Sequence, residues 1–252
     1  MKTITLLISA LAILTVSTAN AASLFEKLGL TSPSTNTTPT LSTVLSQDEI
    51  TGGLKEALSN GVQHAVGLLG KEDGFLKDAA VKIPMPENLR KVERTLRMLR
   101  QDQLADEFVT TLNRAAEQAV PEAAAVLGDA VTKMTLTDAQ AILTSTNNAA
   151  TAYFRRTSET NLYERFLPIV QKTTADAGVT GAYKKMVDKA SFGGFSAGSL
   201  LGQDTANLDS YVTHKALDGL FLKIGQEEQQ IRANPVARTT DLLQKVFGAV
   251  AK

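Results

Sequence analysis

The chain has 252 residues, with 26 basic and 26 acidic side chains and no cysteine. A formal net charge of zero provides no overall attraction to polyanions, so we do not expect a nucleic-acid partner. The missing cysteine excludes disulfides and thiol catalysis, and it removes the acceptor for a bacterial lipid anchor.

The first 21 residues have the pattern of a secretory signal peptide. Lys2 gives a positive start, residues 4–16 are apolar apart from Ser and Thr, and Ala19-Asn20-Ala21 supplies the small residues of a cleavage site. We therefore expect a soluble periplasmic protein of about 231 residues. No later segment has about 18 uninterrupted apolar residues, so we expect no transmembrane segment in the mature chain.

Residues 22–45 are expected to form a flexible segment, because residues 31–43 are mostly Ser, Thr and Pro. Residues 46–252 are expected to form a single helical domain. Apolar residues at helical spacing predict helices over residues 46–69, 87–100, 102–119, 121–134, 148–177, 179–190, 208–233 and 239–250.

Capping signals and prolines refine this pattern. Ser46 and Glu49 have capping-box spacing, and Thr137 with Gln140 predicts a second box that opens another short helix. Residues 81–86 should be extended, because Pro84 and Pro86 disfavour helix at the residues before them. No segment alternates in the manner of a strand, so the predicted fold class is all-α, a compact multi-helix bundle.

The clearest match to a catalytic motif is G-x-S-x-G at residues 194–198, centred on Ser196. Asp204, Asp209 and His214 follow in the order used by α/β-hydrolases. That motif requires a strand before the serine and a helix after it, whereas helical sequence precedes it here. We interpret residues 192–202 as a Gly-rich loop and predict no catalytic residue with this motif.

Metal and cofactor chemistry find little support. The chain has two histidines, His64 and His214, and neither belongs to a Glu-x-x-His or His-Glu-x-x-His motif. No Asp-rich loop suggests a calcium site. We predict no metal site and no cofactor.

A basic face is predicted on the helix of residues 87–100. At 100° per residue, Arg90, Arg94 and Arg97 fall within about 60° of one another. Such a face could bind an anionic lipid headgroup, lipopolysaccharide or an acidic partner. The simpler interpretation is a solvated surface, because Asp102 and Asp106 follow at once and could pair with it.

Two polar clusters are candidates for binding. Asn113, Arg114 and Glu117 lie away from the apolar stripe of their helix and between alanines, so we expect partial burial. A structural network is the favoured interpretation, with a ligand site as the alternative. His214 and Asp218 form an i,i+4 pair on a later helix.

Several short blocks in order carry a resemblance. They are GLKEAL at 53–58, DGF at 73–75, IPMP at 83–86, NRAAE at 113–117, YFR at 153–155, YVTHKALDGLF at 211–221 and EQQIRANP at 228–235. Together they resemble a bacterial family of exported proteins classed only as a domain of unknown function. The resemblance implies a mostly helical envelope protein of proteobacterial type, without established catalytic residues.

Two functions remain open after these observations. One is a non-enzymatic periplasmic binding or interaction module whose partner is an envelope protein, a lipid or a small ligand. The other is an envelope hydrolase that uses Ser196, or polar residues such as Glu117, Arg114 and Asp218. The chain lacks cysteine, metal-binding motifs and the strand–turn–helix context of a hydrolase, and these absences favour the binding module.

Overall fold

The structure is a computed structural model that describes residues 46–145, 147–177 and 204–233. The expected signal peptide, the segment 22–45, the helices at 179–190 and 239–250, and the loop with Ser196 lie outside the described residues.

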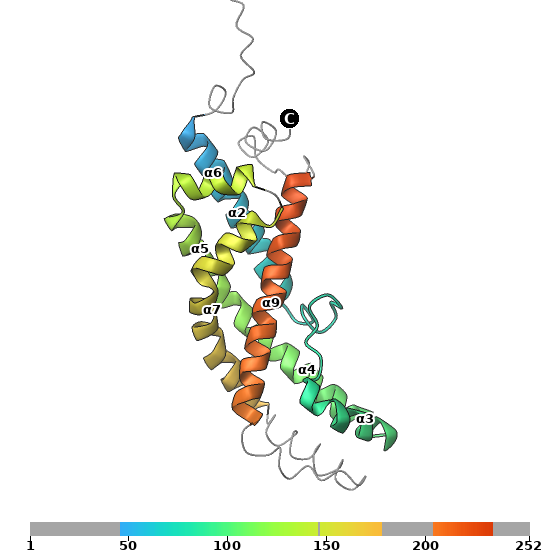
Figure 1. Cartoon of the computed structure of the whole chain (residues 1–252). Coiled ribbons are helices and arrows are strands. Elements are labelled where there is room, and N and C mark those ends of the chain that lie inside the picture. Colours follow the sequence, from blue (N-terminus) through green and yellow to red (C-terminus); the bar gives the residue numbers. More distant parts are fainter. Residues whose placement is uncertain (1–45, 146, 178–203, 234–252) are drawn as a thin grey trace, which may run out of the picture. The chain divides into compact units, whose positions relative to one another are not determined.

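Helices make up all the regular structure in the described ranges, which confirms the all-α class. Their order is α2 (Gln47–Leu69), η2 (Glu87–Leu89), α3 (Arg90–Met98), α4 (Asp102–Ala119), η3 (Val120–Glu122), α5 (Ala123–Lys133), α6 (Leu136–Thr144), α7 (Ala149–Asp176) and α9 (Asp204–Ala233). Figure 1 shows the arrangement of these helices. None of the helices described here combines the length and apolar character needed to cross a membrane.

The predicted start of α2 is confirmed in detail. The Ser46 hydroxyl accepts the Glu49 N–H at 3.2 Å, and the Glu49 carboxylate accepts the Ser46 N–H at 2.8 Å. This reciprocal capping box satisfies two N–H groups that the first turn leaves without helical partners.

The predicted start of α6 is wrong by two residues. Thr135, not Thr137, is the N-cap, since its hydroxyl accepts the Asp138 N–H at 3.1 Å. The Asp138 carboxylate in turn accepts the Thr135 N–H at 3.1 Å and its hydroxyl at 2.6 Å. An aspartate at N3 therefore fills the role that the sequence pattern assigned to Gln140.

The predicted helix of residues 87–100 begins with the short η2 and ends at Met98. Arg100 takes a left-handed conformation, with φ of 55°, and reverses the chain into α4. The Gln101 N–H donates to the Leu96 carbonyl at 2.8 Å, which closes this turn.

The longest helices, α7 and α9, pack side by side in opposite directions (Figure 1). Thr174, near the end of α7, donates to Asp209 at 2.8 Å, while Thr151, in the first turn of α7, donates to Glu228 at 2.9 Å. α2 packs against α9 and α5, and α4 packs against α7.

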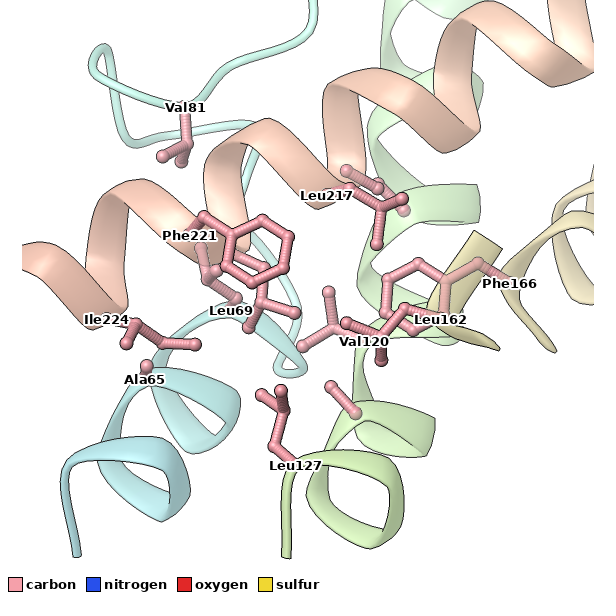
Figure 2. Packing of buried hydrophobic residues seen from close by; sticks show 14 of the residues in the cluster. Ala65, Leu69, Val81, Val120, Leu127, Leu162, Phe166, Leu217, Phe221 and Ile224 are labelled. Atoms are coloured by element: carbon pink, nitrogen blue, oxygen red, sulfur yellow. The ribbon is translucent and has the colours of Figure 1, made fainter. Parts of the chain in front are cut away.

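One buried cluster of apolar side chains joins these helices (Figure 2). Phe166 of α7 and Phe221 of α9 lie almost wholly out of solvent, together with Leu127 of α5 and Leu69 of α2. Many of the remaining core positions are alanines, which let helix backbones approach closely.

Candidate functional site

The chain between α2 and η2, residues 70–86, is a non-helical loop held by polar side chains of α4. Asn113 is fully buried, and its amide pairs with both backbone groups of Ile83. Its oxygen accepts the Ile83 N–H at 2.8 Å, and its nitrogen donates to the Ile83 carbonyl at 2.9 Å and to the Val109 carbonyl at 2.7 Å. The Asn113 side chain thus provides the hydrogen bonds that a neighbouring strand would give to the extended segment predicted at 81–86.

Glu117, which is 3% exposed, binds the other end of the same loop. One carboxylate oxygen accepts the N–H groups of Phe75 at 3.0 Å and Leu76 at 3.2 Å. The second oxygen accepts from Arg114 at 2.6 Å. Two backbone donors and one guanidinium therefore surround this carboxylate and compensate the cost of burying it.

Arg114 extends the network to the surface of the loop. Its second terminal nitrogen lies 2.7 Å from Asp73 and 3.1 Å from Glu72. Asp73 has a positive φ of 66°, and its pKa is lowered chiefly by a hydrogen bond from Lys77 and then by Arg114. The guanidinium thereby fixes a strained turn beside the buried glutamate.

α9 holds the loop from a second direction. Lys223 pairs with Asp78 at 2.5 Å, and the Tyr211 hydroxyl donates to the Pro84 carbonyl at 3.2 Å. The Phe75 ring packs so closely on Gly219 that a Cβ there would lie 2.7 Å from it. The loop is therefore a fixed bridge between α4 and α9.

The structure places Asn113, Arg114 and Glu117 together, as predicted. All three side chains hydrogen-bond to the loop of residues 70–86. Within the described ranges, no buried side-chain nitrogen or oxygen lacks a hydrogen-bond partner. Every side-chain nitrogen and oxygen of Asn113 and Glu117 is hydrogen-bonded to the protein, which supports the structural interpretation of this cluster.

His214 and Asp218 have different surroundings, on the exposed side of α9. The His214 ring lies against the Tyr163 ring, with centroids 4.8 Å apart. Asp218 lies 3.6 Å from Arg155 and 3.9 Å from Lys215. Neither residue hydrogen-bonds to Asn113, Arg114 or Glu117 in the part of the chain that the structure describes.

Asp218 instead borders an open groove of about 550 Å³ between α7 and α9. Polar side chains and three apolar ones line it: Asn148, Thr151, Arg155, Asp218, Gln226, Gln229, Ala152, Phe221 and Leu222. The Arg155 guanidinium lies over the Phe221 ring, 4.5 Å from its centroid, and Leu222 is 43% exposed. Gly225 also lines the groove and has no side chain to fill it.

A second hollow of about 660 Å³ lies along α4. Its threonines, Thr110 and Thr111, donate to backbone carbonyls of their own helix, and Gln103 donates to Glu107. Polar side chains of the α7–α9 groove are bonded in the same way, as Gln229 is to Asn148 at 3.2 Å. That groove adds an exposed apolar side chain, Leu222, so it is the better candidate site.

The sequence pattern did not identify the role of Glu228 and Arg232, which have the i,i+4 spacing of an ordinary ion pair along a helix. The Glu228 carboxylate accepts the N–H groups of Ala150 at 3.1 Å and Thr151 at 3.0 Å, at the start of α7. Arg232 donates to the carbonyls of Ile142 at 2.7 Å and Ser145 at 3.4 Å, at the end of α6. The negative Glu228 thus caps the N-terminus of α7 and the positive Arg232 caps the C-terminus of α6, and each charge is favourable for the helix dipole at that end.

The predicted basic face is divided by the structure into paired and unpaired cations. Arg97 contacts Glu93 at 2.9 Å, Asp106 at 3.0 Å and Asp102 at 3.3 Å, and Arg90 pairs with Glu87 at 2.7 Å. Arg94 is exposed and makes no ion pair with another described residue.

No group of three or more His, Asp or Glu side chains within the described ranges could hold a metal ion. Ser196 lies outside those ranges, so the geometry of its motif is not described.

Comparison with known proteins identifies the family. No curated protein and no solved structure matches the chain. A family model described as "Protein of unknown function (DUF4197)" matches residues 44–248, which include every helix described above. The chain therefore belongs to the DUF4197 family of proteins of unknown function.

Proposed function

We propose that this chain is an exported, non-enzymatic binding module of the cell envelope, and that the groove between α7 and α9 is its ligand site. The observation that carries the proposal is the groove itself. It is open, it has a volume in the range of ligand sites, and it combines an apolar floor with unburied polar side chains.

The chemistry of the lining suggests the class of ligand. The exposed Leu222 offers apolar contact, while Gln226 and Gln229 offer amide donors and acceptors. Arg155 and Asp218 place one charge of each sign at the rim, 3.6 Å apart. This lining suits a small molecule with an apolar body and hydrogen-bonding substituents.

The alternative is an envelope hydrolase. Its proposed polar residues Glu117 and Arg114 are bound to the loop of residues 70–86, which weighs against their use in catalysis. Ser196 remains the other possible nucleophile. Covalent labelling of Ser196 by a fluorophosphonate probe would contradict the binding-module proposal and favour this hydrolase.

Two leucines of nearly equal exposure provide a matched test of the groove. Leu222 is 43% exposed in the groove, and Leu99 is 44% exposed at the end of α3. We expect Leu222→Gln to reduce the amount of ligand that co-purifies with the protein at least fivefold, and Leu99→Gln to leave it unchanged. Both variants should keep the wild-type melting temperature, since both positions are partly in solvent.

The measurement is mass spectrometry of small molecules released by denaturing the purified protein. A wild-type protein that releases no bound molecule, or equal retention by the two variants, would rule out the groove as the site.

Export is a separate prediction. The apolar run and Ala19-Asn20-Ala21 lead us to expect cleavage after Ala21 and recovery of the chain from the periplasm. Intact-mass measurement of the periplasmic protein tests this, because a mass that retains residues 1–21 would contradict it.

A further inference from the structure

α3 has one face packed on the protein and an opposite face that no described helix covers. Val92 and Leu96 are fully buried on the first face. At 100° per residue, Lys91, Arg94 and Met98 share the opposite face within about 60°. All three of these side chains are exposed.

The cations on this outer face form no ion pairs within the described part of the chain. Lys91 and Arg94 make no ion pair with any described residue, whereas Arg90 and Arg97 are both paired. The nearby carboxylates of Asp102 and Asp106 are directed at Arg97. Two positive charges are therefore available to an external anion.

An apolar side chain lies at the end of the same face. Met98 is 73% exposed, which places it among the most exposed large apolar side chains in the described ranges. Cations beside exposed apolar side chains are the combination with which a surface helix binds a bilayer. The cations attract anionic headgroups, and the apolar groups reach the edge of the acyl region.

We propose that α3 docks on an anionic phospholipid surface through Lys91, Arg94 and Met98. An acidic protein would satisfy the two charges, but the exposed Met98 favours a partner with an apolar layer beneath its anionic groups. The proposal is independent of the α7–α9 groove, so either can fail without the other.

Vesicle flotation tests this proposal with the whole secreted chain. The vesicles contain either phosphatidylcholine alone or phosphatidylcholine with 30 mol% phosphatidylglycerol, at low and high salt. We expect binding to the anionic vesicles only, and its loss at high salt. Lys91→Gln with Arg94→Gln should weaken partitioning about 25-fold, since each surface cation contributes about fivefold.

The matched control is Lys82→Gln with Lys133→Gln, which removes the same total charge from exposed positions elsewhere. It should bind anionic vesicles within about twofold of wild type. Met98→Ser should weaken binding at unchanged charge. Equal losses for the two double variants would overturn the proposal, because net charge alone would then explain binding. Failure of the wild type to bind either vesicle would also overturn it and would favour an acidic protein partner.

Discussion

Replacing Glu117 with alanine is expected to lower the free energy of unfolding by about 3–5 kcal/mol, the usual cost of breaking a buried ion pair on one side. The substitution removes the acceptor of the Phe75 and Leu76 N–H groups and leaves Arg114 without its closest partner. Chemical denaturation followed by circular dichroism measures the effect.

Glu107→Ala is the matched control on the same helix. Glu107 is exposed, and among the described residues its carboxylate accepts a hydrogen bond only from Gln103, so its loss should change stability by less than about 0.5 kcal/mol. Equal stability of the two variants would mean that the loop does not depend on the buried carboxylate.

Arginine variants separate the contribution of the ion pair from that of the backbone bonds. Arg114→Ala leaves Glu117 with its two N–H donors, and it should therefore be less harmful than Glu117→Ala. Arg94→Ala removes an exposed cation that pairs with no other residue described by the structure, and it should be nearly neutral. If Arg114→Ala is as stable as Arg94→Ala but loses a bound ligand, the cluster is a binding site rather than a structural network.

The helices of this fold could be predicted because their signals are local. Apolar spacing and capping residues lie within a few positions of the structure they specify, as at Ser46 and Glu49. The error at α6 arose because Thr135 and Thr137 are both plausible caps for a helix that contains Asp138. Only the hydrogen-bond geometry distinguishes them.

The candidate site could be predicted only in part, because its partners are distant in sequence. The neighbouring alanines indicated partial burial of Asn113 and Glu117, although both residues lie away from the apolar stripe of their helix. Their partners, the backbone groups of Ile83 and Phe75, lie 30 and 42 residues away, where no side-chain pattern marks them. The α7–α9 groove was missed for the same reason, since Arg155 and Phe221 meet only after the two helices pack.

Glu228→Ala is expected to cost about 3 kcal/mol, because one substitution removes the cap of α7 and one half of an ion pair whose carboxylate is buried. α7 begins at Ala149 after Asn148, which has a left-handed φ of 73° and provides no side-chain cap. The Glu228 carboxylate takes over that function from α9 and is 6% exposed. Its partner Arg232 would keep its carbonyl acceptors on α6 but lose its counter-charge.

Two further variants separate these effects. The Ala150 and Thr151 N–H groups donate to different oxygens of Glu228, so Glu228→Gln keeps one acceptor, replaces the other with an NH2 group and loses the charge. A smaller loss than in Glu228→Ala, about 1–2 kcal/mol, is expected. Glu164→Ala, at an exposed position of α7, should be close to neutral. Hydrogen exchange supplies a local measurement: amides in the first turn of α7 should exchange faster in Glu228→Ala than amides in the middle of α7. Uniform acceleration along the helix would show that the loss is global, and the carboxylate would then not act as the cap of α7.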